Sequence, residues 1–261
     1  MIVLYYSYED ISLYYEKYGD KPNTIVILPG WGDTRHTFDS LISVLSLTST
    51  VYILDYPGFG KTKFPNHSMT VYDYASMIHA WIEDLRLDDP LFIGHSFGGR
   101  LLILLNGYYH YNYSNFIFLD AAGIKPGKTL KSRLKNLRYS LLKKIARILP
   151  KKKRKNYLNS LFQKFASPDY LALSEDMRPT FRNIVNTDLS YSLKDITSRV
   201  LLIWGENDSA TPISDAKKMR KEIPNSELII LKNLGHFPYL ERGDWVYQII
   251  FAHLQEINFF R

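Results

Sequence analysis

A serine between two glycines is the residue of this chain best placed to do chemistry. Leu91, Phe92 and Ile93 run apolar into Gly94-His95-Ser96-Phe97-Gly98, and residues 101–105 continue apolar behind it. This pattern predicts a strand, a very tight turn and a helix, with Ser96 at the apex of the turn. The two glycines allow strand and helix to approach closely. The turn therefore presents a hydroxyl that could attack a carbonyl carbon.

Such a hydroxyl becomes nucleophilic only when a base takes its proton, so a catalytic serine needs a histidine or similar base beside it, and an acid to orient that base. Two polar residues follow predicted strands later in the chain: Asp208 comes after the apolar run 199–205, and His236 comes after residues 228–231. His236 would take the serine proton and return it to the leaving group, while Asp208 would hold the imidazole in the right tautomer. Asp120 also follows a predicted strand and remains an alternative acid.

Serine, acid and histidine stand in the chain order of α/β-hydrolases, and the chain resembles that superfamily over nearly its whole length. The resemblance is carried by five motifs, which are Leu28-Pro29-Gly30-Trp31-Gly32, Asp55-Tyr56-Pro57-Gly58-Phe59-Gly60, the serine turn, Trp204-Gly205-Glu206-Asn207-Asp208 and Gly235-His236-Phe237. It implies the α/β-hydrolase fold in the serine hydrolase branch: a mostly parallel central sheet flanked by helices, with a helical cap inserted before the strand that carries the acid.

The resemblance also implies an oxyanion hole made by the backbone N–H groups of Trp31 and Phe97. Such donors stabilise the negative charge of a tetrahedral intermediate. The family usually has His-Gly where this chain has Pro29-Gly30. This departure leaves the amide of Trp31 available, but it removes any role that the missing histidine side chain would have.

The remaining pattern is consistent with that architecture. Strands and helices alternate before residue 120 and after residue 198, which predicts a mostly parallel sheet covered on both faces, and two Tyr-rich runs at 3–8 and 11–18 predict an antiparallel hairpin at its edge. The gap from 120 to 199 is too long for a plain crossover. We therefore predict a core made of 1–121 and 198–261, with 122–197 as the cap.

The cap segment carries the positive charge of the protein. The chain has a net charge of +7, yet residues 125–164 hold fifteen Lys or Arg and no acidic residue. Within this segment, Leu134, Leu137, Leu141, Ile145 and Ile148 recur at helical spacing, which predicts an amphipathic helix. Three interpretations remain open for the basic region 130–155: a solvated cap face, a peripheral membrane contact, or steering of an anionic substrate.

Several other classes of protein are poorly supported by the sequence. Gly58-Phe59-Gly60-Lys61-Thr62 lacks the first glycine of a phosphate-binding loop, no nucleic-acid-binding module is apparent, and no His/Asp/Glu cluster shows metal-ligand spacing. We expect no cofactor and no metal. The chain has no cysteine, no secretory signal and no apolar run long enough to span a membrane, so we expect a cytoplasmic protein. The oligomeric state is left open.

Three functions remain as hypotheses. The first is a carboxylesterase-like serine hydrolase that cleaves a small ester or related acyl substrate through an acyl-enzyme on Ser96. The second is a carbon–carbon bond hydrolase or lyase with the same triad; a lyase of this fold resembles the chain in having an arginine at the position of Arg100, although a surface or salt-bridging role for Arg100 is the simpler interpretation. The third is a non-catalytic binding or membrane-surface protein on the same fold.

Overall fold

The computed structural model describes residues 1–125, 130–165 and 168–260. In these residues, eight strands form one sheet in the order β1-β2-β4-β3-β5-β6-β7-β8. Their bounds are β1 Ile2–Tyr8, β2 Ile11–Tyr18, β3 Thr24–Leu28, β4 Thr50–Leu54, β5 Leu91–His95, β6 Asn115–Leu119, β7 Arg199–Gly205 and β8 Ser226–Leu231. β1 and β2 pair antiparallel at one edge, β2 is also antiparallel to β4, and all other pairs are parallel. The predicted mostly parallel sheet is thus confirmed.

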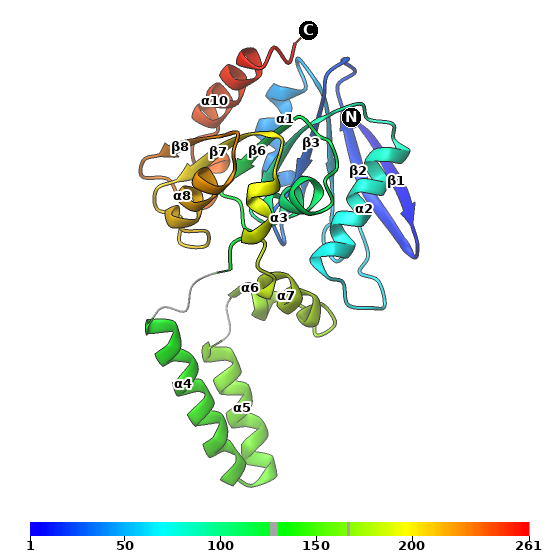
Figure 1. Ribbon diagram of the computed structural model, residues 1–261. Coiled ribbons are helices and arrows are strands. Elements are labelled where there is room, and N and C mark those ends of the chain that lie inside the picture. The colour runs from blue at the N-terminus through cyan, green and yellow to red at the C-terminus, as the bar shows by residue number, and fades with distance from the viewer. Residues whose placement is uncertain (126–129, 166–167, 261) are drawn as a thin grey trace.

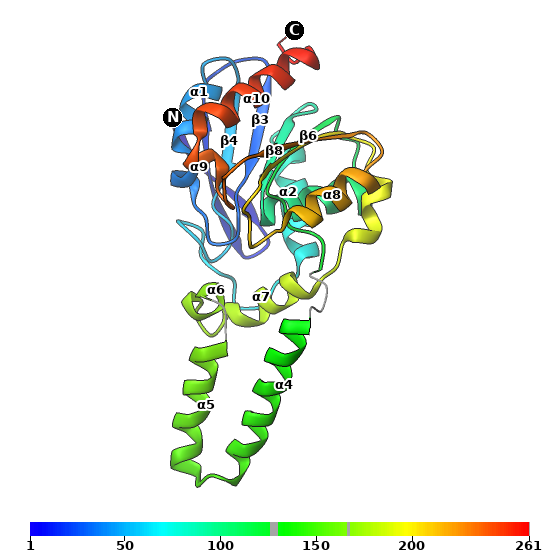
Figure 2. The same ribbon diagram turned by 90° about the vertical axis from the view of Figure 1, so that its left-hand side faces the viewer.

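Helices cover both faces of this sheet (Figures 1 and 2). One face is covered by α1 (Asp39–Leu45), α9 (Pro238–Glu241) and α10 (Gly243–Glu256). The other is covered by α2 (Val71–Asp84), α3 (Phe97–Leu102) with its π-helical continuation (Ile103–Tyr108), and α8 (Ile213–Glu222). Short 3-10 turns lie at Arg35–Phe38, Ala146–Ile148 and Ser190–Asp195.

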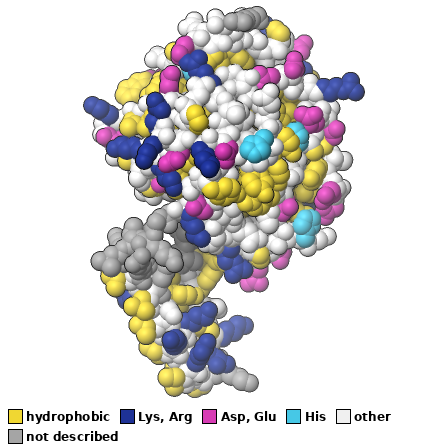
Figure 3. Space-filling model, in the orientation of Figure 1, with side chains coloured by type: hydrophobic (Ala, Val, Ile, Leu, Met, Phe, Trp, Pro, Cys, Tyr) yellow, Lys and Arg dark blue, Asp and Glu magenta, His cyan; other side chains and the backbone are white. Residues whose placement is uncertain are grey.

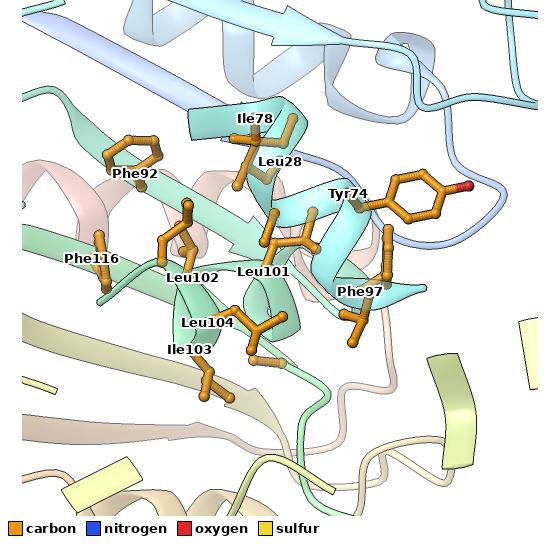
Figure 4. Close-up of a cluster of buried hydrophobic side chains, with 14 of the residues drawn as sticks. Leu28, Tyr74, Ile78, Phe92, Phe97, Leu101, Leu102, Ile103, Leu104 and Phe116 are labelled. Carbon is orange, nitrogen blue, oxygen red and sulfur yellow. The ribbon is translucent and has the colours of Figure 1, made fainter. Parts of the chain in front are cut away.

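Side-chain alternation along the central strands divides the core between the two faces. In β3, Val26 and Leu28 point into the cluster beneath α2 and α3, whereas Ile25 and Ile27 point into the opposite cluster, as the two-residue period of a strand requires. Figure 4 shows the first cluster, in which Leu101 and Leu102 of α3 lie among side chains of the neighbouring strands and of α2. α3 and the serine turn before it are therefore anchored in the best-packed part of the molecule.

The predicted insertion between β6 and β7 is helical. It contains α4 (Leu130–Ile145), α5 (Lys151–Phe165), α6 (Pro168–Ala172) and α7 (Met177–Asn186). α4 and α5 form an antiparallel helical hairpin that projects away from the sheet, while α6 and α7 lie between this hairpin and the rest of the molecule (Figures 1 and 2). Residues 126–129 and 166–167 of the predicted segment 122–197, and residue 261, lie outside the described residues.

The second half of the hairpin is one continuous helix. α5 begins at Lys151, directly after Pro150, and has 15 residues. Lysine and arginine favour helix strongly, and Pro150 ends the preceding turn without preventing a new helix from starting after it. Among the described helices, none is long and apolar enough to cross a membrane.

Candidate active site

The serine turn has the predicted strand–turn–helix form. β5 ends at His95 and α3 begins at Phe97, and Ser96 between them has a positive φ of 46° with ψ of −104°, a backbone conformation that non-glycine residues rarely adopt. A Cβ atom on Gly98 would lie 1.9 Å from the carbonyl oxygen of Leu28, so only glycine fits where α3 crosses β3. The strain at Ser96 is held in place by this close packing.

Asp208 and His236 meet after two neighbouring strands, β7 and β8. The Asp208 Oδ2 atom lies 2.8 Å from His236 Nδ1. The Asp208 carboxylate also accepts hydrogen bonds from the backbone N–H groups of Ala210 at 2.7 Å and Thr211 at 3.0 Å, and from the Thr211 hydroxyl. The acid is therefore held rigidly by its own loop and oriented toward the imidazole.

Ser96 and His236 line the same cavity. Within the described residues, Ser96 Oγ makes no hydrogen bond, so the hydroxyl is open to the cavity rather than tied into the turn. Catalytic hydrogen bonds in unliganded enzymes are often long and tighten only when substrate binds. Ser96 and His236 thus lie at one cavity, and Asp208 is joined to them through its contact with His236.

Asp120, the alternative acid, occupies a different position in the same network. It follows β6 and accepts a hydrogen bond from the backbone N–H of Gly205 at 2.9 Å, and its Oδ2 atom finds no donor among the described residues. Burial raises the pKa of Asp120 to about 9, and the neighbouring Asp208 carboxylate adds to this rise. Burial also opposes ionisation of Asp208, but hydrogen bonds from His236, Thr211 and Asp120 outweigh it and lower the pKa of Asp208 to about 2. At neutral pH, Asp208 is therefore the charged partner of His236 and Asp120 holds a proton.

This difference predicts a pH-dependent stability effect at Asp120. A buried carboxyl whose pKa is raised from 3.8 to about 9 contributes full stability below about pH 4, and loses that contribution as the pH rises toward 9. Asn has the same shape but does not ionise, so Asp120→Asn should gain melting temperature relative to the parent protein as the pH is raised from 5 to 9. Each kcal/mol gained raises Tm by roughly 2–4 °C in a protein of this size, which thermal unfolding across that range can measure.

The control for this experiment is Asp195→Asn, because Asp195 is an exposed acid outside the network. Its Tm difference from the parent protein should not change with pH. A constant Tm difference for Asp120→Asn would mean that Asp120 is ionised in the folded protein across the whole range.

Asp120, Asp208 and His236 also form a cluster of potential ligand atoms that the sequence did not indicate. No metal-ligand spacing is visible in the sequence, yet folding brings ligand atoms of Asp120, Asp208 and His236 to within 4.8 Å of one another. The chemistry of this set suits proton handling better than cation binding, since Asp120 keeps its proton and the Asp208–His236 pair is already joined by a hydrogen bond.

The two residues whose amides are expected to form the oxyanion hole both line the cavity. Trp31 is in the loop after β3, where Asp33 closes a turn by donating its N–H to the Gly30 carbonyl. Phe97 is the first residue of α3, and the N–H groups of a first helical turn have no partner inside the helix. Among the described residues, neither the Trp31 nor the Phe97 amide donates a hydrogen bond, so both remain available to a bound oxyanion.

His95 links the loops on either side of the serine. Its side chain is 1% exposed, with Nε2 lying 2.9 Å from the His236 carbonyl oxygen and Nδ1 lying 3.1 Å from the Asp33 carboxylate. The Tyr239 hydroxyl is 3.3 Å from the same Nδ1. Burial lowers the pKa of His95, although Asp33 acts in the opposite direction. His95 therefore joins the loop of Trp31 to the loop of His236, a role the sequence did not indicate.

Arg100 is not the surface or salt-bridging residue that the simpler interpretation expected. It is 5% exposed and lines the cavity, and within the described residues no carboxylate lies within 4 Å of its guanidinium. Its Nη1 donates a hydrogen bond to the Thr187 carbonyl oxygen at 2.6 Å, and burial lowers its pKa to about 10. The correction follows from tertiary structure: the segment after α7 covers this position of α3, which a helical pattern alone would place at the surface.

The cavity itself has a volume of about 430 Å³ and a largely apolar wall. Its apolar side chains come from both the core and the insertion; besides Ala122, Ala210 and Phe237 they are Trp31, Phe97, Ile124, Phe181, Ile184 and Val185. The last three belong to α7, whose role the sequence did not identify. Thr211 was also missed, although an acid three residues before a threonine in a loop is a common signal for a turn closed by the acid side chain.

Comparison with known proteins agrees with this geometry. Residues 25–249 match the alpha/beta hydrolase family. The chain is 25% identical to monoacylglycerol lipase ABHD6 of Mus musculus, over 99% of this chain and 84% of that protein, and 24% identical to the uncharacterized hydrolase YugF of Bacillus subtilis (strain 168), over 92% and 93%. The solved structure of a membrane phospholipase A, described as a bacterial virulence factor, superposes with a TM-score of 0.77 at 19% identity, covering 98% of this chain and 86% of that one. The protein therefore belongs to the α/β-hydrolase family and is an enzyme of that type.

Proposed function

We propose that the protein is a serine hydrolase that cleaves a carboxylic ester or related acyl compound, with Ser96, His236 and Asp208 as its catalytic triad. The observation that carries this proposal is the charged Asp208 bound to His236 Nδ1 at 2.8 Å, beside a cavity that also exposes the strained Ser96. An imidazole held in this way has its other nitrogen free to accept a proton from a hydroxyl.

Each step of the reaction has a residue suited to it. Ser96 Oγ attacks the substrate carbonyl carbon while His236 Nε2 takes the hydroxyl proton, and the developing oxyanion accepts hydrogen bonds from the Trp31 and Phe97 amides. His236 then gives its proton to the departing alcohol, leaving an acyl group on Ser96. Water, activated by the same imidazole, releases the acid. Each oxyanion donor contributes about 3 kcal/mol to lowering the barrier in enzymes of this kind.

The proposed function also divides the chain into a catalytic core and a cap. We assign residues 1–121 and 198–261 to the catalytic core and 122–197 to a cap. α7 supports the assignment because its Phe181, Ile184 and Val185 side chains line the cavity opposite the core. An apolar wall of this kind suits the acyl chain of an ester, and the name of the relative ABHD6, a monoacylglycerol lipase, points toward lipid esters.

Activity profiling tests this function. A panel of p-nitrophenyl esters and thioesters of increasing acyl length should be hydrolysed, with kcat/KM rising until the acyl chain fills the cavity. A fluorophosphonate probe should label the protein in a single stoichiometric step. If the folded protein neither turns over any ester nor reacts with the probe, the serine hydrolase proposal fails.

Arg100 favours a second candidate, a carbon–carbon bond hydrolase or lyase with the same triad. A buried guanidinium with one backbone partner keeps most of its N–H donors unused by the described residues, and such donors bind carboxylates or enolate oxygens well. Substrates of that class carry such groups. Turnover of a vinylogous 1,5-diketone or of a lyase substrate, in the absence of ester hydrolysis, would identify this reaction instead.

Arg100 also yields a prediction for ester hydrolysis. Arg100→Met should lower kcat/KM for an acyl substrate ending in a carboxylate, such as p-nitrophenyl hydrogen glutarate, by roughly 10- to 100-fold, because a charged hydrogen bond of about 1.5–3 kcal/mol is lost. Hydrolysis of neutral p-nitrophenyl valerate should change far less. Steady-state kinetics on the two substrates measures the ratio.

The control is Arg100→Lys, which keeps the charge and should recover part of the preference for the anionic substrate. Equal losses on both substrates would mean that Arg100 serves only to hold the Thr187 carbonyl.

A further inference from the structure

The helical hairpin formed by α4 and α5 exposes a continuous row of large apolar side chains. Leu134 and Leu137 are each 58% exposed, Leu141 and Ile145 are each 52% exposed, and Ile148 is 85% exposed. We call these five residues the outer stripe. Helical periodicity explains why the first four lie on one side of α4, and Ile148 follows in the 3-10 turn after it. A water-soluble helix ordinarily turns such a face toward its own core. Here the face is turned toward solvent.

A second apolar face of α4 makes the contact with α5. Ala146 is 1% exposed and Leu161 of α5 is 5% exposed, and the rings of Tyr139 and Phe165 lie 5.3 Å apart. On a helix that turns about 100° per residue, Tyr139 and Ala146 lie roughly 140–160° from the axis of the outer stripe, close to the opposite side. The hairpin is thus already closed by one face of α4, so the outer stripe is not needed for its internal packing.

Basic side chains flank the outer stripe on both sides. At about 100° per residue, exposed Arg138 and Lys144 lie roughly 60° from its axis, one on each side. Residues 125–164 hold fifteen Lys or Arg and no Asp or Glu. Figure 3 shows hydrophobic side chains along the hairpin with Lys and Arg side chains beside them. Long basic side chains in this position can extend to lipid headgroups while the apolar residues between them enter the acyl region.

We propose that the outer stripe docks the protein on the surface of an anionic lipid bilayer. Charge complementarity selects this occupant. A second copy of the chain would bring two strongly basic hairpins together, which like-charge repulsion opposes. A nucleic acid would satisfy the Lys and Arg side chains but would leave five apolar side chains in water. An anionic bilayer satisfies both, since each basic residue near its surface contributes about 1 kcal/mol and each buried apolar side chain adds to this.

The position of the hairpin relates docking to the cavity. α6 and α7 lie between the hairpin and the rest of the molecule (Figure 2), and α7 contributes Phe181, Ile184 and Val185 to the cavity wall. A docked hairpin therefore connects through the cap to the site where an acyl substrate would bind. Docking itself does not depend on catalysis, so its test is independent of the proposed function.

Vesicle co-sedimentation tests the proposal. The probe is a sucrose-loaded vesicle of phosphatidylcholine, either pure or with about one third phosphatidylglycerol, a mimic of an anionic membrane surface. The full chain should bind the anionic vesicles and bind pure phosphatidylcholine much less. Leu137→Ser combined with Leu141→Ser should lower the partition coefficient for anionic vesicles by at least about tenfold, because two apolar side chains no longer enter the bilayer.

The matched control is Leu47→Ser combined with Leu240→Ser. These two leucines are 70% and 52% exposed, but they lie on the surface of the α/β part of the protein and not on the hairpin. This variant should bind vesicles like the parent protein, as should Ser96→Ala, which removes only the proposed nucleophile. Circular dichroism confirms that each variant is folded.

Three results would overturn the proposal. One is equal vesicle binding by the parent protein and the Leu137/Leu141 variant, which would leave only non-specific charge attraction. Another is no binding of the parent protein to anionic vesicles at low salt. The third is an oligomer in analytical ultracentrifugation that the Leu137/Leu141 substitutions dissociate, which would make a second copy the occupant of the outer stripe.

Discussion

Replacing Ser96 by alanine should reduce ester hydrolysis by at least about 10⁴-fold, because the acyl-enzyme cannot form without its oxygen. The variant should also lose all labelling by a fluorophosphonate, which reacts only with an activated serine. The loss should appear in kcat rather than KM, since the apolar cavity wall and the Trp31 and Phe97 amides remain. Steady-state kinetics on the best ester, together with gel-based labelling, measures both effects.

Ser190→Ala provides the control for this change, because Ser190 lies in the segment after α7 and its hydroxyl donates a hydrogen bond to the Asp188 carboxylate. It should keep parental activity and labelling. If Ser96→Ala retained labelling at another residue, the nucleophile would lie elsewhere. If the parent protein were inert and Ser96→Ala left every cellular property unchanged, a binding protein on the hydrolase fold would be the better description.

The second large effect distinguishes the two acids. Asp208→Asn should lower kcat by about 10⁴-fold at neutral pH, because the amide removes the negative charge beside His236 and favours the wrong imidazole tautomer. Asp120→Asn should stay within a few-fold of the parent protein at the same pH. This difference in kcat between the two variants follows from the pKa values, which leave Asp208 ionised and Asp120 protonated at neutral pH. An uncharged Asn side chain therefore resembles the protonated Asp120 closely but not the ionised Asp208.

The two variants serve as each other's control, because both replace a buried carboxyl of one network by an amide of equal size. Their pH profiles add a further readout. In the parent protein, ionisation of Asp120 near pH 9 places a second negative charge beside Asp208 and should change kcat/KM, and this change should be absent in Asp120→Asn. A loss of activity confined to Asp120→Asn would make Asp120 the triad acid.

Much of the fold could be predicted because its signals are local. The apolar run before Ser96 and the glycines around it specify a strand and a tight turn from nearby residues alone, and parallel strands necessarily gather their carboxyl ends at one edge of the sheet. The likeness of five motifs to one superfamily added the overall fold and the helical cap inserted into it. Serine, acid and histidine could thus be placed at one edge from positions far apart in the sequence.

The sequence by itself determined the fold class, the position of the helical insertion and the candidate nucleophile and base, Ser96 and His236, since each depends on short-range pattern and chain order. Only the tertiary structure distinguishes Asp208, which contacts His236, from Asp120, because both acids follow neighbouring strands and differ in burial and in the hydrogen bonds that they make. It also buried Arg100 beneath the segment after α7 and turned the outer stripe of α4 toward solvent. Periodicity identifies an apolar face of a helix, but what covers that face depends on residues distant in the chain.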